Sequence, residues 1–501
     1  MQKRLMFDEP DVSVEQAAAP VGYAGIYGFH KYWGKKPHEP IAYAIQQLTK
    51  PGDIVVDPFL GSGSSAREAM VRNRRFIGFD VNPVAVELAT FISAPPKREA
   101  VRAAIEIITK DVKSKIHATY ALGSGETATH YLWDGKDLKE VWIKGSAKLA
   151  RRELKPTRHD FALIESFNSY RSRLVQTPRF FSNGRINASP EMNLDSLLTP
   201  RAQHNLDLLI ESVSASPPSV RKALQLCLTA ASGQMSRMVF AVTGRGKTKG
   251  ESAEKVEVGS WVIGYWRPRL HFEVNVWNCF ENRARKLLAA LKEANDNPKI
   301  PFGGRPEDVV EKKATCFVGV MDCRKGLERL PSGSCTLVIT DPPHSDRVPY
   351  LELSEFWNSI LGKVSNLKDE IVISNAKERA KTEDEYQNAM SNFLSQATRV
   401  LEPDGSLVVF FNARQTDSWA AISKLIRTPA ETGLSYDGKF PCNYSANSVV
   451  QDNRKGALKH DWALVFSKGS SRRLAGGGHR LSNIPGWSAD FPAIIASSPN
   501  S

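Results

Sequence analysis

The chain has few cysteines, and their spacing argues against several kinds of site. The six cysteines are scattered along 501 residues: Cys227, Cys279, Cys316, Cys323, Cys335 and Cys442. No two of them form a C-x-x-C pair, so the sequence has no zinc-ribbon or redox-pair pattern, and we predict no metal site. Low cysteine usage without a disulfide pattern suits a reducing compartment, which predicts a cytoplasmic protein.

Long apolar runs are missing as well. No stretch of about 18 apolar residues exists, so we expect no membrane span. The first residues, MQKRLMFDEPDVSVEQ, bring acidic side chains where a signal peptide would have its apolar core. The signatures of two other chemistries are also lacking: a serine nucleophile elbow with its triad, and the H-x-E with P-C-x-x-C of zinc deaminases.

Positive charge is in surplus. The net charge is +13 and the isoelectric point is about 9.3. A surplus of this size favours a polyanionic partner, nucleic acid first, although a merely basic protein would have the same charge. The hydrophobic fraction of 41% and the charged fraction of 24% are ordinary, so the chain can bury sizeable cores.

Two segments alternate strands and helices in the way that a doubly wound parallel α/β sheet does. In the first, a strand over 53–56 enters the loop DPFLGSGSS, and a helix over 66–73, a strand over 74–80 and a helix over 82–92 follow. The second begins with a strand from residue 314 and a helix over 323–330. The apolar run CTLVIT over 335–340 then predicts a strand buried on both faces. A helix-rich stretch, a strand over 406–412, a helix over 418–426 and a strand over 461–468 complete the predicted sheet.

Changes in composition, charge and secondary-structure pattern along the chain predict five parts. Residues 1–20 are expected to be a mobile arm, 21–95 and 315–470 the two parts of the α/β domain, and 471–501 a flexible tail. Residues 96–314 between them are more helical and more basic, with ten Lys/Arg against three Asp/Glu over 141–190. A large, mixed, helix-rich insert is the simplest interpretation, because the alternative of one domain with very long loops is rare.

A glycine loop predicts a cofactor site at the edge of the sheet. Its G-x-G follows a strand and opens a helix, which lets a cofactor approach the backbone. Asp80 closes the next strand, where a carboxylate can take ribose hydroxyls. The pattern of a phosphate-binding P-loop is absent, and no third glycine completes a dinucleotide fingerprint. The residues concerned are Asp57, Pro58, Phe59, Gly61, Gly63 and Asp80.

This loop resembles that of the amino-directed DNA methyltransferases. VDPFLGSGSSAREA and RRFIGFDVNP are similar to the family's D-P-F-x-G-x-G-T-T and I-G-x-D/E-x-N/D-P, with Ser64-Ser65 where Thr-Thr is usual. The resemblance covers about residues 28–95 and 315–470. It implies a Rossmann-like class I methyltransferase fold and S-adenosylmethionine as the cofactor, held by the loop residues named above.

Two further cofactor contacts are implied by the same resemblance. HKYWGKKP over 30–37 resembles the segment that the family places beside the methionine end of the cofactor, which implies that Lys36 and Pro37 line the site. Taken alone, this segment would be a turn that packs aromatic side chains on the core. Asp322 would bind the amino group of the cofactor's adenine, and its place before a helix also suits an N-cap.

The motif Asp341-Pro342-Pro343-His344 follows the buried strand CTLVIT. An exocyclic amine is a poor nucleophile, and two acceptors that hold its hydrogens can turn its lone pair toward a methyl donor. The Asp341 carboxylate and the Pro342 carbonyl would be these acceptors. The family's motif is D/N/S-P-P-Y/F/W, whose aromatic ring stacks on the flipped base. His344 is therefore a functional variant, a sign of a shifted substrate, or a mark of a weakened enzyme.

Other residues extend the predicted site. Tyr350, Phe356 and Trp357 are candidates for the wall of the base pocket, with ordinary helix core as the alternative. Basic residues of the insert are candidates for phosphate contacts: Arg151, Arg152, Arg245, Lys247 and Lys249.

We therefore expect an enzyme that flips a base out of double-stranded DNA and methylates its exocyclic amine. The leading Asp341 favours N6 of adenine by resemblance. An RNA amino-methyltransferase, a cytosine-N4 DNA methyltransferase and a catalytically retired nucleic-acid-binding protein remain open. DNA binding would associate the protein with the nucleoid, and restriction or another defence system would supply partner proteins.

Overall fold

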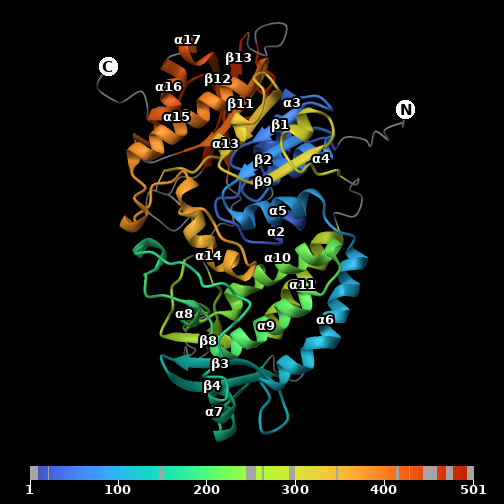
Figure 1. Ribbon diagram of the computed structural model, residues 1–501, viewed down its shortest axis with the longest axis vertical. Coiled ribbons are helices and arrows are strands. Elements are labelled where there is room, and N and C mark those ends of the chain that lie inside the picture. Colours follow the sequence, from blue (N-terminus) through green and yellow to red (C-terminus); the bar gives the residue numbers. More distant parts are fainter. Residues whose placement is uncertain are drawn as a thin grey trace, which may run out of the picture.

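The computed structural model describes residues 10–20, 22–145, 151–243, 256–261, 264–292, 300–345, 348–412, 417–427, 429–443, 460–469 and 478–492. Figure 1 shows an elongated molecule with two halves. A large sheet and its helices make up the upper half, and a helical layer with a small sheet makes up the lower half. Among the described helices, none is long and apolar enough to cross a membrane.

The upper half is built on a seven-stranded sheet. Its strands lie side by side in the order β12 (Leu434–Asn443), β13 (His460–Lys468), β11 (Leu401–Phe411), β10 (Cys335–Thr340), β1 (Ile54–Asp57), β2 (Arg75–Asp80) and β9 (Cys316–Val320). The five strands from β11 to β9 are parallel, whereas β13 runs antiparallel to both β11 and β12. Every residue of β1 and β10 is buried, as the apolar runs in the sequence predict for inner parallel strands.

Helices cover both faces of this sheet. Because strand side chains alternate, Val55 faces one apolar cluster while Ile54 and Val56 face the other. The first cluster includes residues of α3 (His38–Leu48), α4 (Ser64–Val71) and α5 (Pro83–Ser93). The second includes residues of α12 (Glu307–Val310), α13 (Cys323–Glu328), α15 (Glu383–Val400) and α16 (Ala420–Arg427). The upper half is therefore a three-layer α/β arrangement.

The order of the strands defines one special place at the edge of the sheet. From β1 the chain proceeds through β2 to β9 on one side, and then returns to place β10 on the other side of β1. In parallel sheets, ligands bind in the crevice that such a reversal opens at the carboxyl ends of the strands. The reversal here puts that crevice where β1 enters the glycine loop and β10 enters the Asp341 motif.

The lower half is formed by the chain between α5 and α12. Its antiparallel sheet has the order β5 (Arg151–Leu154), β4 (Asp137–Lys144), β3 (Ala128–Asp134) and β8 (Leu270–Val274). Its helices are α6 (Arg98–Ala118), α7 (Arg158–Glu165), α8 (Leu194–Leu197), α9 (Pro200–Ser214), α10 (Pro218–Met235) and α11 (Val276–Lys292), and β6 (Ala241–Val242) pairs with β7 (Glu257–Val258). The insert is thus mixed, with helices and an antiparallel sheet.

The two halves share one apolar core. The cluster that holds α9, α10 and α11 also contains Phe29 and Trp33, part of α5, and residues of α14 (Tyr350–Ile360). Residues 300–314, predicted to belong to the insert, instead lie against the large sheet: α12 packs in its core, and Phe302 forms a bridge with Cys316. The boundary predicted at 314 therefore lies too late, because the apolar face of α12 finds its partner in the upper half.

The predicted arm and tail need correction where the structure describes them. In the arm, α1 (Val14–Ala18) begins with a capping box at Ser13 and buries Ala17 in the core that holds α3. In the tail, Leu481 and Ile484 are buried in the same core, and Ser488 bridges to Lys439 of β12. These short segments are ordered because a few apolar side chains dock on the sheet half. The other described elements are two short α-helices, α2 (Gly25–Gly28) and α17 (Pro429–Thr432), and four 3-10 helices: η1 (Gly184–Ile186), η2 (Leu367–Asp369), η3 (Lys377–Arg379) and η4 (Asp417–Trp419).

Candidate active site

A cleft of about 920 Å³, including the space open to solvent, lies at the carboxyl edge of the large sheet. The ends of β9, β2, β1 and β10 form its floor, the turn over 32–36 forms one wall, and residues 369–371 with the start of α14 form another. Predicted site residues that line this cleft are Lys36, Asp57, Pro58, Phe59, Gly61, Asp80, Asp341 and Pro343. Residues 36–80 and residues 341–343, which are far apart in the sequence, thus meet at the point between β1 and β10 where the strand order reverses.

Asp57 fastens the glycine loop to the strand that carries Asp341. Its carboxylate accepts hydrogen bonds from the Thr340 hydroxyl at 2.6 Å, from the Phe59 amide at 3.1 Å and from the Ser65 hydroxyl. Burial raises the pKa of Asp57 to about 6. The side chain is almost fully enclosed, so we assign it the role of an anchor that holds loop and strand in register.

Asp80 shapes the loop from the next strand. Its two oxygens accept hydrogen bonds from the amides of Gly61 and Asn82, each at 2.8 Å. Gly61 has a φ of 52°, a left-handed conformation that glycine adopts without strain, and this turn brings its amide to the carboxylate. Burial raises the pKa of Asp80 to about 7. A carboxylate in this place can accept further hydrogen bonds from hydroxyls of a ligand in the cleft.

Lys36, in the wall of the cleft, forms ion pairs with two carboxylates, one of them that of Asp341. Its ammonium lies 2.7 Å from Asp341 Oδ2, although the two residues are 305 positions apart. It lies equally close to Asp461 Oδ2, at 2.7 Å, on the antiparallel strand β13. The ammonium is buried, so the ion pairs are only weakly screened by solvent.

His344, predicted as the fourth residue of the catalytic motif, does not line the cleft, so its ring is not placed to stack on a base as the family's aromatic ring does. The ring is buried, packs edge-on against Phe411 at 4.8 Å, and places Nε2 3.2 Å from Asp341 Oδ1 and 3.2 Å from the Phe410 carbonyl oxygen. Ser345, with a φ of 57°, bends the chain sharply after it. The Phe410 carbonyl oxygen and the Asp341 carboxylate, together with the bend at Ser345, hold the imidazole in the protein interior and away from the cleft.

Several predicted residues do not line the cleft. Pro342 is buried, Pro37 is the N-cap of α3, and Gly63 packs where a Cβ would lie 2.5 Å from Ala89 of α5. Asp322 is the N-cap of α13, and the Arg324 guanidinium covers its carboxylate at 2.6 Å, while its neighbours Met321 and Cys323 line the cleft. The N-cap interpretation of Asp322 therefore has direct structural support.

The aromatic residues after the motif divide into two kinds. Tyr350 is partly exposed and lines the cleft, with its ring 6.2 Å from that of Tyr32. Phe356 and Trp357 are about 1% exposed and belong to the core shared with the insert. For these two residues the helix-core alternative is correct.

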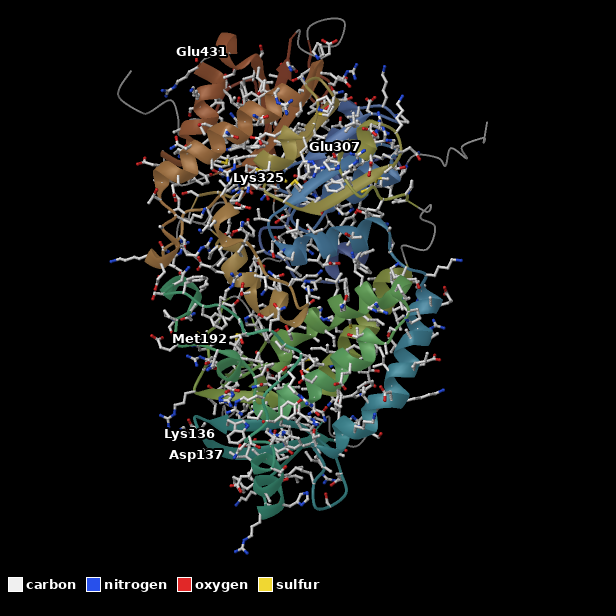
Figure 2. All side chains as sticks on the ribbon, in the orientation of Figure 1. Lys136, Asp137, Met192, Glu307, Lys325 and Glu431 are labelled. Carbon is white, nitrogen blue, oxygen red and sulfur yellow. The ribbon has the colours of Figure 1, made fainter. Side chains whose placement is uncertain are left out.

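The candidate DNA contacts lie far from the cleft or outside the described residues. Arg245, Lys247 and Lys249 are outside them. Arg151 stacks its guanidinium 3.7 Å above the Trp142 ring, and Arg152 is half exposed beside Glu126. Both arginines lie on β5, which pairs with β4 at the lower end of Figure 1. Figure 2 labels two residues at this end, Lys136 in the turn between β3 and β4 and Asp137 at the start of β4.

Two acidic positions of the site were not found from the sequence. Asp461 opens an apolar strand, and a single charged residue at the start of such a strand is the only local signal that it gives. Glu370 lines the cleft from a loop, where it accepts a hydrogen bond from the Leu351 amide at 2.9 Å and pairs with Arg379 at 2.7 Å.

Comparison with known proteins points to one family. Residues 13–91 match the DNA methylase family of N6 and N4 methyltransferases. The chain is 34% identical over 58 residues to the type II methyltransferase M.MjaII of Methanocaldococcus jannaschii, a stretch that covers 12% of this chain and 11% of that protein. It is 43% identical over 53 residues to the type II methyltransferase M.XycI of Xanthomonas campestris pv. cyanopsidis, covering 11% of this chain and 18% of the relative.

A third relative is similar over the same small share of the chain. The type II methyltransferase M2.DpnII of Streptococcus pneumoniae is 36% identical over 63 residues, which cover 12% of this chain and 24% of that protein. The matches thus span between 11% and 24% of these relatives' own lengths.

Proposed function

We propose, from the match of residues 13–91 to the DNA methylase family, that the chain is an amino-directed DNA methyltransferase that methylates an exocyclic amine of a base in DNA, with N6 of adenine as the preferred target. The observation that carries the proposal is the cleft itself. It joins the glycine loop of the matched segment to Asp341, which lies far outside that segment. We further propose that the sheet is the Rossmann-like sheet of a class I methyltransferase, interrupted by a target-recognition insert.

The residues of the cleft fit S-adenosylmethionine as the cofactor. The Asp80 carboxylate can accept ribose hydroxyls, and the apolar side chains of Phe59, Met321 and Ile371 offer flat or flexible surfaces for a purine. When bound, S-adenosylmethionine supplies an electrophilic methyl group on a sulfonium.

Asp341 would then position the amine that receives the methyl group. Its carboxylate is the acidic group that opens to the cleft from the end of β10, with 22% of the side chain exposed. An amine hydrogen held on this carboxylate turns the nitrogen lone pair out of conjugation with the base ring and toward the methyl donor. After transfer, the nitrogen loses one proton to the Asp341 carboxylate or to water.

Tyr350 is our candidate for the planar surface beneath the flipped base. His344 is turned inward, and Tyr350 presents a partly exposed ring to the same cleft. Stacking on an aromatic ring stabilises an extruded base in a sequence-tolerant way.

Product identification tests the proposal. Purified protein is incubated with labelled S-adenosylmethionine and unmethylated genomic DNA, and the digested nucleosides are identified by mass spectrometry. N6-methyladenine is the expected product. N4-methylcytosine would keep the mechanism and overturn the choice of base. Product on RNA alone would reassign the substrate, and cofactor binding without transfer to either polymer would indicate a retired enzyme.

A further inference from the structure

Four ionisable side chains form a ring at the edge of the sheet where β10 and β11 end and β13 begins. Lys36 Nζ bridges Asp341 Oδ2 and Asp461 Oδ2 at 2.7 Å each, and His344 Nε2 lies 3.2 Å from Asp341 Oδ1. His344 Nδ1 closes the ring at 4.0 Å from Asp461 Oδ1. Two carboxylates therefore share one ammonium and one imidazole.

Only one member of the ring opens appreciably to the cleft. The side chains of Lys36, His344 and Asp461 are 5%, 6% and 0% exposed, whereas that of Asp341 is 22% exposed. A charged group that is buried away from water is stabilised mainly by nearby groups of opposite charge. The attraction between opposite charges is also stronger there, because little water screens it. The three enclosed groups therefore fix where the Asp341 carboxylate lies.

The surroundings of the imidazole define which way its hydrogen bond runs. Nε2 carries a hydrogen, because it donates a hydrogen bond to the Phe410 carbonyl oxygen at 3.2 Å. Asp341 Oδ1 lies beside the same N–H group at 3.2 Å, as a close polar contact that does not meet hydrogen-bond geometry. The oxygen atoms of Asp341 and Asp461 and a ring nitrogen of His344 are close enough to hold a metal ion, but the Lys36 ammonium already brings a positive charge to both carboxylates.

We infer that His344 and Asp461 are positioning residues for the methyl transfer: His344 orients Asp341 through the close contact of its Nε2–H group with Asp341 Oδ1, and Asp461 holds the Lys36 ammonium against the same carboxylate. His344 thus replaces the family's stacking ring by a donor that acts from beneath the edge of the sheet. The inference rests on the proposed function and names further residues of the same site.

A matched pair of variants at one position separates donor from ring. His344→Gln keeps an N–H near the place of Nε2, whereas His344→Phe keeps a planar ring and has no donor. We expect kcat to fall about 100-fold in H344F, as for a displaced catalytic group, and about 10-fold or less in H344Q. The KM for DNA should change by less than about twofold in both. The reverse order, with the loss in KM for DNA, would mean that His344 stacks on the base and would overturn the inference.

Asp461→Asn tests the far side of the ring. We expect kcat to fall about 10-fold while the Kd of S-adenosylmethionine remains within about twofold, because the Lys36 ammonium loses one of its two anchors. Asp437→Asn is the matched control, since this enclosed carboxylate also faces a histidine, His479, at 3.6 Å on the same group of strands. The Asp437 carboxylate accepts a hydrogen bond from Ser467, which pairs with Ser406 at the start of β11. Asp437 therefore lies at the end of the strands that is remote from Asp341, and kcat should not change in D437N.

The outcomes keep the two claims apart. Wild-type protein that transfers no methyl group to DNA overturns the proposed function, and this inference with it. Active wild type together with an unchanged kcat in D461N overturns the inference alone. Thermal unfolding is measured for every variant, and if D461N does not fold, the His344 pair decides.

Discussion

Each half of the molecule buries ion pairs, but in different surroundings. In the insert, Arg201 and Glu273 are both 2% exposed, 2.9 Å apart, and enclosed by the Tyr120 and Tyr131 rings, which lie 4.5 and 4.3 Å from the guanidinium. In the sheet half, the ring around Asp341 has two carboxylates for one ammonium and opens to a cleft. The contrast teaches that enclosed, balanced charge serves the fold, whereas unbalanced charge at an opening is available for chemistry.

Glu273→Gln should produce the largest effect, and it should be on stability. The variant leaves the Arg201 guanidinium enclosed without its counter-charge, so we expect the free energy of unfolding to fall by about 3–5 kcal/mol. Denaturant unfolding measures the loss, and kcat per folded molecule should not change. A loss of kcat with unchanged stability would contradict the contrast and give the insert pair a role in catalysis.

Tyr350→Ala should act on the substrate. Removal of the ring should raise the KM for DNA about tenfold or more, because base stacking on an aromatic side chain contributes about 1–3 kcal/mol. Steady-state kinetics against DNA concentration measure it. Tyr350→Phe keeps the ring and is the control, with a KM close to that of the wild type. Equal losses in both variants would assign the effect to the hydroxyl group instead.

The sheet half was largely predictable from the sequence because its signals are local. The run CTLVIT gives β10 at the predicted residues 335–340, and glycines mark the turn between β1 and α4. The strand β12 was missed, since it contains Gly438, Lys439 and Pro441 and is a strand through its pairing with β13. Pairing partners distant in sequence leave no local pattern.

The ring of charged side chains around Asp341 could not be predicted from the sequence either, because its members are distant from one another along the chain. Lys36, Asp341 and Asp461 come together only when the turn before α3, the end of β10 and the start of β13 meet at one edge. The direction of His344 depends on the acceptors beneath the sheet and on the bend at Ser345, neither of which the motif reveals. The order of residues 14–18 and 478–492 likewise comes from docking on the sheet half.

Asp80→Asn should weaken cofactor binding about tenfold, or roughly 1.5 kcal/mol, since hydrogen bonds to a charged acceptor are lost. The ionised carboxylate is the form that accepts ribose hydroxyls. Because the pKa of Asp80 is raised to about 7, wild-type affinity should fall as the pH decreases through 7 and level off above it. Calorimetric titrations between pH 6 and pH 8.5 test this, and a variant with the same pH dependence as the wild type would exclude Asp80 as its source.

Arg152→Ala should have the smallest effect, on DNA affinity, and it tests whether the insert contacts DNA. If Arg152 contacts a phosphate, DNA affinity should weaken slightly and the slope of log K against log salt should decrease by about 1. Lys325→Ala is the control, an exposed cation of the sheet half that is labelled in Figure 2. Equal changes in both slopes would indicate diffuse attraction without a contact at Arg152.

The most direct test of the central claim compares wild type with Asp341→Ala in the transfer of labelled methyl groups to DNA. We expect transfer to fall by about 100-fold or more in the variant, which should fold and bind S-adenosylmethionine with an affinity close to that of the wild type. Label incorporation at the wild-type rate would contradict it, since the cleft would then act on its substrate without the carboxylate at its centre.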